Sequence, residues 1–445
     1  MVKKICRRFQ KSIIFFLELL LYVGNYAIFF LLLGIDNKQL LVLSRTSVVI
    51  TFTWIIITVL LTIIYGKYDI GVRKSKPIVI SLTLSSIITD VIAYLLLMIM
   101  TRNEDNNQTF RFEFIGFFLI IVVLHVLVIA ALTYLGNGFY FWVIDPDSTL
   151  IVTSNQEPVE KLRFVIGKFH RKYRIDQVLN YQDPSLKERV KSADSVFLYD
   201  IPVGERTEIV NYCYKHMVNV YYNPEVADIL EQTSRQAMFD DVTFLASEVK
   251  GMTFEQRIIK RLMDIVISAI ALIITSPIFL ISALCIKKYD KGSIFFRQKR
   301  ATIHGKVFSI YKFRTMKEHV ENRSATKDDD RITPIGKILR KYRIDELPQF
   351  INILKGEMSV VGPRPEMLSN VDEYTKEMPE FRYRLRMKAG LTGYAQIMGK
   401  YNTSSKDKLM MDLLYIENYS VLKDIQLIFQ TVTVLLKADD STEAF

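Results

Sequence analysis

The chain has 445 residues, of which half are hydrophobic, and a formal net charge of +11. This length is too great for one compact domain, and the apolar residues are concentrated in the first third, so we expect several domains, one of them in a membrane. The positive charge suits an anionic bilayer surface and phosphate ligands, and no segment resembles a nucleic-acid-binding module. Three scattered cysteines and five isolated histidines exclude a disulfide framework and argue against a zinc site.

Four apolar runs occupy residues 12–34, 47–65, 78–100 and 115–135. Each has about 20 residues, which is enough to cross a bilayer core of roughly 30 Å. The first run has no small-residue cleavage site, so a cleaved signal peptide is not expected. The sequence therefore predicts a four-helix transmembrane bundle over residues 1–136.

Basic residues flank these runs unevenly. They precede the first run and lie between the second and third, at Lys3, Lys4, Arg7, Arg8, Lys11, Lys67, Arg73, Lys74 and Lys76. Positively charged connections stay in the cytoplasm, so both segments belong there. The fourth span then returns the chain to the cytoplasm, where it stays from about residue 137 onward.

Three ionisable residues, Glu18, Asp90 and His125, fall within the apolar runs. Such groups cost several kcal/mol inside a bilayer unless they are partnered. A conduction path and pairing between helices are the two interpretations. Pairing is favoured, because no run repeats such residues at helical spacing.

Residues 149–223 alternate between strand-like and helix-like segments and predict a small parallel α/β domain, which we expect to span 137–245. The turn after the first strand, 154–157, lacks the glycines that let a backbone approach a pyrophosphate, so we predict a degenerate Rossmann-like domain that binds no dinucleotide. A spacer, regulatory or dimerisation role suits it, and a homodimer through this domain is compatible with the sequence. Residues 224–256 are expected to form a polar, partly helical linker.

A fifth apolar run, 262–286, has basic residues at both ends. Positive charge on both flanks places both ends on the cytoplasmic side. Ser276 and Pro277 lie near its middle, where proline removes a helix hydrogen bond and bends the chain. We therefore expect a re-entrant helix that enters one leaflet and returns, with a kinked crossing helix as the alternative.

The segment 340–349 sets Asp345 and Glu346 among basic residues, just before Pro348. Apolar spacing predicts a helix that starts near Leu347 and ends at Gly356, which places Asp345 near the N-cap. An ionised carboxylate beside a helix N-terminus can attack phosphorus or hold a divalent metal. Simple helix capping is the other interpretation.

Further segments in the last third carry cations or glycines. Residues 295–316 predict a β-hairpin with cations on its polar positions, and two prolines flank Arg364 and would present its guanidinium rigidly to a pyrophosphate or uracil group. The run Gly390–Gly393 permits close backbone approach. Residues 406–437 have helical periodicity.

Taken together, the motifs FFRQKR, YKFRTM, DDDRITPIG, RIDELPQ, VVGPRP and GLTGYAQ resemble the bacterial sugar transferase family over about 255–437. These are monotopic polyprenyl-phosphate sugar-1-phosphate transferases, and the four predicted spans are similar to the large form of the family. The resemblance implies a mainly helical catalytic domain over 246–445. It also implies a bacterial cytoplasmic membrane enzyme that moves a sugar 1-phosphate from a UDP-sugar to undecaprenyl phosphate, uses Mg²⁺ and releases UMP, as the first step of capsule, exopolysaccharide or O-antigen synthesis.

The resemblance also assigns roles to particular residues. Asp345 corresponds to a nucleophile that forms a covalent phosphosugar intermediate, and Glu346 to its partner, both helping to hold the metal. The remaining matched positions are basic residues that would bind phosphates or the nucleotide: Lys312, Arg314, Arg331, Arg340, Arg364 and Lys400. Pro277 corresponds to the kink of the re-entrant helix.

Three positions depart from the family pattern, at Ala389, Tyr394 and Lys400, where proline, tryptophan and arginine are frequent. Lysine is a point charge, not a bidentate fork, so these changes bear on donor preference more than on reaction class. Two alternatives stay open: a membrane scaffold or regulator whose catalytic domain has decayed, and a glycosyltransferase that releases UDP. The intact pair Asp345 and Glu346 argues against decay.

Overall fold

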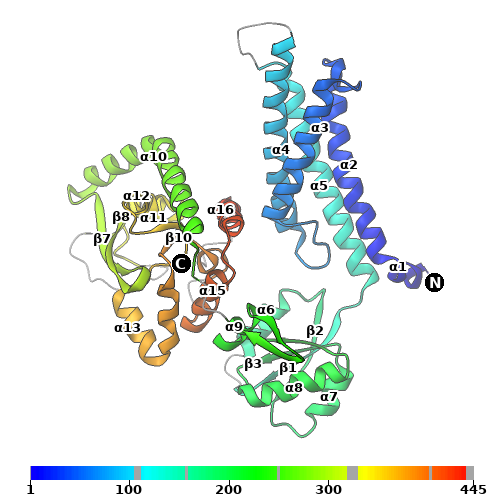
Figure 1. The fold of residues 1–445 in the computed structure, drawn as a ribbon, viewed down its shortest axis with the longest axis vertical. Coiled ribbons are helices and arrows are strands. Elements are labelled where there is room, and N and C mark those ends of the chain that lie inside the picture. Colours follow the sequence, from blue (N-terminus) through cyan, green and yellow to red (C-terminus); the bar gives the residue numbers. More distant parts are fainter. Residues whose placement is uncertain are drawn as a thin grey trace. The chain divides into compact units, whose positions relative to one another are not determined.

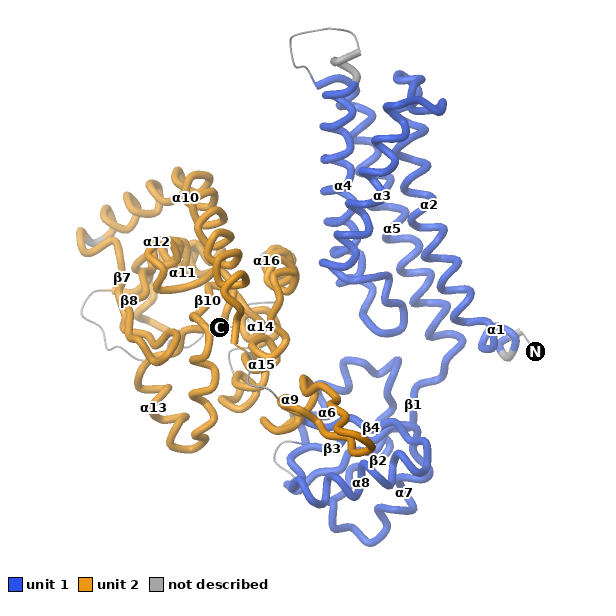
Figure 2. Tube along the Cα trace, in the orientation of Figure 1, with its two compact units in different colours: residues 1–223 blue, residues 224–445 orange. Residues whose placement is uncertain are grey.

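The computed structural model describes residues 2–104, 112–155, 159–247, 251–317, 329–399 and 403–436. The chain forms two compact units, Met1–Asn223 and Pro224–Phe445 (Figure 2).

Long apolar helices dominate the first 143 residues. They are α1 Val2–Arg8, α2 Gln10–Gly34, η1 Lys38–Leu40, α3 Arg45–Tyr65, α4 Ser75–Glu104 and α5 Ile115–Val143. Helices α2 to α5 lie side by side in a bundle (Figure 1), with α3 against α4 and α5 against both α2 and α4. In the described chain, five helices are long and apolar enough to cross a membrane: these four and α10, Phe254–Asp290. The protein is therefore membrane-associated, and the number of crossings stays a prediction.

Two of the ionisable residues in the apolar runs are partners inside this bundle. His125 on α5 places Nδ1 2.7 Å from Oδ2 of Asp90 on α4, and both side chains are almost completely buried. Trp54 on α3 donates to the other carboxylate oxygen, and Nε2 of His125 lies 2.9 Å from the carbonyl oxygen of Asn25 on α2. Pairing between helices is thus confirmed for Asp90 and His125.

A four-stranded parallel sheet follows, in the order β2-β1-β3-β4. Its elements are β1 Asp147–Thr153, α6 Val159–Gly167, β2 Tyr173–Asn180, α7 Leu186–Ser192, β3 Ser195–Tyr199, α8 Val203–Lys215 and β4 Asn219–Tyr222. Apolar residues of β1 and β3 pack against α7 and α8. The predicted small parallel sheet is confirmed. It forms because alternating apolar strands and amphipathic helices have few other ways to bury both layers. Its likeness to a Rossmann fold stays a prediction.

The segment expected as a polar linker contains regular structure. It forms α9 Val226–Gln232 and an antiparallel hairpin, β5 Arg235–Phe239 with β6 Val242–Ala246. Ile229 of α9 is buried in the core of the second unit, and Lys406 of α15 pairs with Glu225 at 2.6 Å. These elements therefore belong to the second compact unit, which begins at Pro224.

The second unit is built from short strands covered by helices. After α10 come β7 Phe295–Ala301, η2 Ile303–Gly305, β8 Val307–Phe313, α11 Pro334–Lys341, η3 Ile344–Glu346, α12 Gln349–Lys355, β9 Ser359–Val361, α13 Leu368–Glu377, η4 Pro379–Arg386, β10 Gly390–Thr392, α14 Tyr394–Met398, α15 Ser405–Glu417 and α16 Val421–Leu436. Strands β7 and β8 form the expected hairpin. The C-terminal helical stretch is two helices, because Asn418–Ser420 interrupts it.

Helix α10 bends sharply part-way along (Figure 1). Pro277 lies inside it and lacks the N–H that would bond the carbonyl of Ile273, and the hydroxyl of Ser276 donates to that carbonyl instead, at 2.8 Å. Both ends then pack on the same unit: Ile286 joins a core with Phe313 and Leu339, and Lys260 contacts Val361 near the other end. The bend therefore returns the chain to the domain from which it left. Its exposed apolar side chains, such as Ile273 and Ile274, suit insertion into one leaflet.

Candidate active site

Asp345 and Glu346 lie in a short 3-10 turn, not at the N-cap of a helix. The turn begins after Arg343, which has φ 53°, and α12 begins after Pro348. The N-cap prediction is wrong, because Arg343 turns the chain back sharply, and the 3-10 turn and Pro348 separate Asp345 from α12. Gly356 does end α12, in a left-handed conformation with φ 82°, as predicted.

Glu346 is paired with Lys312, which reaches it from β8. The Nζ of Lys312 donates to Oε1 of Glu346 at 2.7 Å. Burial alone would raise the pKa of Glu346, but Lys312, Arg364 and Arg343 outweigh it and lower the pKa to about 2. Glu346 is therefore ionised at neutral pH.

The pKa of Asp345 moves in the opposite direction. Its carboxyl group is buried, and burial, helped by the negative charge of Glu346, raises the pKa to about 6 against the opposing charges of Lys312 and Arg340. Two neighbouring carboxyl groups with separated pKa values are typical of a site where one acts on the substrate and the other stays charged.

Arg340 is fixed at the end of α11. Its Nε donates to the hydroxyl of Thr315 at 2.9 Å, and burial lowers the pKa of its guanidinium, while Asp345 opposes that shift. The segment after β8 is joined to α11 by close packing, since a Cβ on Gly336 would lie 2.1 Å from the carbonyl oxygen of Thr315. Only glycine permits this approach, which sets Arg340 beside the carboxyl pair.

Arg331 and Arg314 are both buried, and their predicted phosphate-binding role stays a prediction. Arg331 forms a two-pronged ion pair with Asp329, with Nε 2.7 Å from Oδ1 and Nη2 on Oδ2. Arg314 lies immediately after β8, where its backbone N–H bonds Ile294. Arg331 still affects the site electrostatically, because it adds positive charge near Arg340. Lys400 lies outside the described residues.

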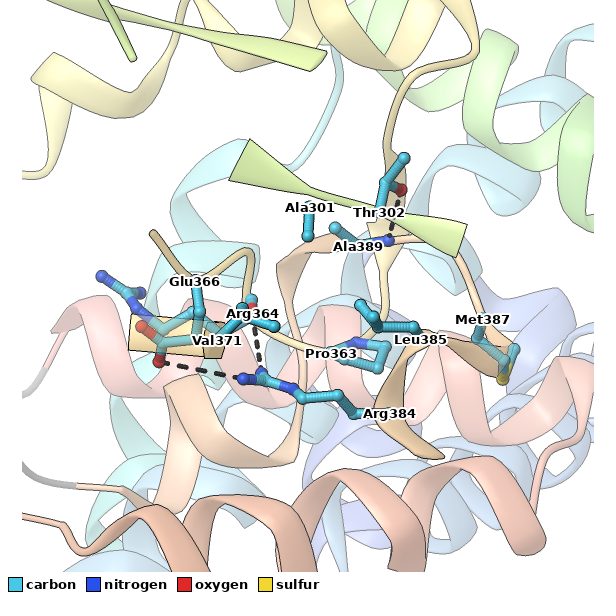
Figure 3. Close-up of a pocket in the computed structure, with 10 residues that line it drawn as sticks. All are labelled: Ala301, Thr302, Pro363, Arg364, Glu366, Val371, Arg384, Leu385, Met387 and Ala389. Carbon is cyan, nitrogen blue, oxygen red and sulfur yellow. Dashed lines mark hydrogen bonds and ion pairs between the residues drawn. The ribbon is translucent and has the colours of Figure 1, made fainter. Parts of the chain in front are cut away.

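Arg364 is the third predicted cation that acts on the carboxyl pair, since its charge lowers the pKa of Glu346. It lines a small pocket with Pro363, Glu366, Val371 and Leu385 among others (Figure 3). The proline-flanked backbone is held by Arg384, whose Nη2 donates to the carbonyl oxygen of Arg364 at 2.6 Å. The guanidinium of Arg364 is thus presented from a backbone that is fixed by bonding as well as by proline.

A buried charge network behind Arg364 was not predicted from the sequence. Arg384 lies 2.6 Å from Asp412 and 4.0 Å from Glu366, and Lys408 lies 3.4 Å from Glu366. Burial raises the pKa of Asp412 to about 6, against the charge of Arg384. The sequence offered no signal beyond charged residues inside apolar helical patterns, such as Asp412 within α15.

The glycine run 390–393 serves packing within the chain. A Cβ on Gly390 would lie 2.0 Å from the backbone nitrogen of Gly362, and one on Gly393 would lie 2.3 Å from the oxygen of Gly362. The close backbone approach is confirmed, but its partner is the strand that leads to Arg364. These glycines therefore support the position of the arginine.

A metal site of three protein ligands is not found among the described residues, which hold no suitable group of three or more His, Cys, Asp and Glu side chains. Magnesium differs from zinc here, because it is commonly bound by one or two carboxylates together with substrate phosphates. The pair Asp345 and Glu346 fits that donor set.

Comparison with known proteins gives the family. The model of bacterial sugar transferases matches residues 255–438, the segment that carries this site. An exopolysaccharide production protein of Sinorhizobium fredii is 38% identical over 191 residues, which are 39% of this chain and 83% of that protein. The chain belongs to the bacterial sugar transferase family.

Two longer relatives of this bacterial sugar transferase have more specific names. A UDP-N-acetylgalactosamine-undecaprenyl-phosphate N-acetylgalactosaminephosphotransferase of Aeromonas hydrophila is 41% identical over 184 residues, 40% of this chain and 44% of that protein. A UDP-glucose:undecaprenyl-phosphate glucose-1-phosphate transferase of Klebsiella pneumoniae is 39% identical over 223 residues, 48% of each chain. The match thus spans less than half the length of these two relatives.

Proposed function

We propose that this protein transfers a sugar 1-phosphate from a UDP-sugar to undecaprenyl phosphate and releases UMP. The observation that carries the proposal is the buried pair of Asp345 and Glu346, with separated pKa values, beside Lys312, Arg340 and Arg364. Family membership and the names of the Aeromonas and Klebsiella relatives support the reaction class.

In the first step, a carboxylate oxygen of Asp345 attacks the phosphorus that carries the sugar. The new bond joins Asp345 to that phosphorus, and the bond from phosphorus to the bridging oxygen breaks, so that UMP leaves with the electron pair. Arg364 and Arg340 would bind the negative oxygens of the pyrophosphate, because direct attack by one anion on another is opposed until cations neutralise the charge.

In the second step, a phosphate oxygen of undecaprenyl phosphate attacks the same phosphorus and displaces Asp345. The lipid then carries the sugar through a pyrophosphate, and the carboxylate is regenerated. Glu346 stays ionised throughout because Lys312 and the arginines hold its pKa low. Dividing the transfer in this way means that each step acts at one positioned phosphorus.

Mg²⁺ is the cofactor that this site would use. Asp345 and Glu346 would hold the ion, which supplies charge neutralisation at the phosphates when it is bound. Lys312 donates to Oε1 of Glu346, so one carboxylate that would help to hold the ion is already fixed in position.

The membrane places the two substrates together. The basic flanks of the apolar runs favour a cytoplasmic position for the second unit, and the bent α10 would insert into the inner leaflet from that side. A UDP-sugar from the cytoplasm and the phosphate of a membrane lipid can meet there. A relative named for exopolysaccharide production favours a role in starting such a polymer.

Nucleotide release tests the proposal. The purified protein, mixed with Mg²⁺ and UDP-glucose or UDP-N-acetylgalactosamine but no lipid, should release UMP up to about one equivalent, because the first step can proceed alone. Asp345→Asn should abolish that release. The matched control is Asp372→Asn, which changes an exposed aspartate on α13 and should leave the release intact.

The identity of the nucleotide separates the alternatives. UDP in place of UMP would indicate a glycosyltransferase, and no nucleotide from any UDP-sugar would indicate a decayed scaffold. UMP release that needs lipid, with no trapped adduct on Asp345, would indicate direct attack by the lipid phosphate. Comparing both donors would also identify the sugar.

A further inference from the structure

One turn near the start of α10 contacts the segment that follows the carboxyl pair. Arg261 donates from Nη1 to the carbonyl oxygen of Ile353 and from Nη2 to that of Leu354, both at 2.7 Å. These carbonyls lie in the last turn of α12, where helix carbonyls have no partner within the helix and a cation is favoured. Only Leu347 and Pro348 separate α12 from Glu346, so Arg261 fixes the helix behind the pair.

The same turn also holds the strand that leads to Arg364. Asp264 is buried, and its Oδ1 accepts from the backbone nitrogen of Val360 at 2.8 Å and from the hydroxyl of Ser359 at 2.9 Å. Lys260 is buried too, and its Nζ donates to the carbonyl oxygen of Val361 at 2.9 Å. Strand β9 ends at Val361, two residues before Pro363.

Packing alone would not require charged groups at these positions. Burying ammonium and carboxylate groups costs several kcal/mol per ion, and apolar residues of similar volume are often as stable. Lys260 recovers part of this cost in its ion pair with Asp424, at 2.5 Å. What the charged side chains add is directional bonding to backbone atoms at two separate points, which apolar side chains cannot provide.

We propose that Lys260, Arg261 and Asp264 are positioning residues through which the membrane helix holds the two halves of the active site in register. Arg261 acts on the carboxyl pair through α12, while Lys260 and Asp264 act on Arg364 through β9. The inference rests on the proposed transferase function. It implies that the depth at which α10 sits in the leaflet and the geometry of phosphate transfer are set by the same turn.

Loss of the Asp264 bonds and loss of the Arg261 bonds should have different kinetic effects. Loss of the Asp264 bonds displaces Arg364, which binds the donor phosphates, so Asp264→Ala should raise the KM for the UDP-sugar by about tenfold with a smaller change in kcat. Loss of the Arg261 bonds displaces the carboxyl pair, so Arg261→Met should lower kcat by about tenfold with a smaller change in KM.

The experiment measures lipid-dependent UMP release by the full-length protein in nanodiscs, with UDP-glucose or UDP-N-acetylgalactosamine, whichever the unsubstituted protein accepts. Asp264→Asn keeps an oxygen acceptor and should restore KM to within about threefold of the original, and Arg261→Lys should recover part of kcat. Arg257→Gln is the matched control, because Arg257 is exposed on the same helix and bonds only the nearby carbonyl of Met252 in the described contacts. Melting temperatures and the folded fraction correct each rate for stability.

The kinetic split supports the inference. If kcat fell and KM rose by the same factors in all variants, or if the loss followed only the folded fraction, the turn would have only a structural role. Either result would overturn the inference. Unchanged kinetics in Asp264→Ala and Arg261→Met would overturn it as well. If the unsubstituted protein released no UMP from any donor, the proposed function would fail first, so the two failures are distinguishable.

Discussion

At the scale of single residues, the surroundings of Asp345 and Glu346 give these two adjacent carboxyl groups different pKa values. Burial raises the pKa of Asp345, whereas the ammonium of Lys312 and the charges of Arg364 and Arg343 outweigh the same effect at Glu346. Their difference arises from contacts made across the fold, because the two residues are neighbours in the chain. A carboxyl group with a pKa of about 6 is mostly ionised at neutral pH and is a stronger nucleophile than an ordinary aspartate.

The raised pKa of Asp345 predicts how activity depends on pH. Attack requires the carboxylate, and with a pKa of about 6 the ionised fraction increases as pH rises from 5 to 7. The rate of UMP release before lipid is added should therefore rise by about tenfold over that range and level off above pH 7. A stopped-flow or quenched-flow pH profile at fixed Mg²⁺ measures this.

A second group requires a control, because the pKa of Asp412 is also raised to about 6. Asp412 lies in the network behind Arg364, so Asp412→Asn should change the rate but keep the pH step if Asp345 causes it. Glu346, with a pKa of about 2, does not titrate in this range. A flat profile, or a step lost with Asp412→Asn, would contradict the assignment to Asp345.

At the scale of elements, the bend of α10 depends on two neighbouring residues. Pro277 leaves the carbonyl of Ile273 without a backbone donor, and Ser276 supplies a hydroxyl in its place. Pro277→Leu restores the N–H and favours a straight helix, so the two ends of α10 should no longer lie on one side of the membrane. Loss of kcat should accompany this, since both ends pack on the unit that holds the site.

Cysteine labelling measures that change. In a variant without the natural cysteines, single cysteines at Arg257 and Lys291 should both react with an impermeant maleimide in inverted vesicles. Pro277→Leu should reduce labelling at one end by about tenfold, because a bilayer would then separate the two positions. Thr275→Val is the control, since it removes only the bond from Thr275 to Ala271 and keeps the proline. Equal labelling of both ends in Pro277→Leu would show that packing at Ile286, and not the proline, fixes the bend.

Local patterns predicted elements better than they predicted caps and linkers. The hairpin of β7 and β8, the parallel strands and the end of α12 at Gly356 follow from alternation, apolar spacing and glycine, which act over a few residues. The position of Asp345 in a 3-10 turn depends on the positive φ of Arg343, a backbone conformation that tertiary contacts determine. The segment within 224–247 was predicted as a partly helical linker, but its hairpin and the packing of α9 were missed for the same reason, because α9 buries Ile229 only in the folded unit.

In the candidate site too, local sequence predicted some features, and contacts formed only on folding determined the others. Motif identity was enough to select the pair and Lys312, Arg340 and Arg364, whose charges act on the pair in the structure, while their phosphate-binding role stays a prediction. It could not show that Arg331 is engaged by Asp329, or that Arg384 holds the backbone of Arg364, because both contacts depend on side-chain direction after folding. The predicted magnesium ligation and homodimer stay predictions.

At the scale of the whole molecule, the family match and the candidate site lie in one unit. The family match at 255–438 and the described site residues fall within Pro224–Phe445, and α9 closes the core of that unit. The Sinorhizobium relative, most of which is matched by 191 residues of this chain, indicates that such a segment can make up most of a family member. The first unit would then add membrane helices and a parallel α/β domain to a unit that carries the whole candidate site.

The separated second unit should therefore keep the first chemical step. Residues 224–445, purified in detergent without lipid, should release about one equivalent of UMP from the UDP-sugar at a rate within about threefold of the full chain, because the core and the described site residues lie within this unit. A shorter version that starts at residue 247 removes α9 and its buried Ile229, and should have a lower melting temperature. The 224–445 protein with Asp345→Asn is the inactive control. A folded 224–445 unit that releases no UMP, beside an active full chain, would show that the first unit contributes to catalysis itself.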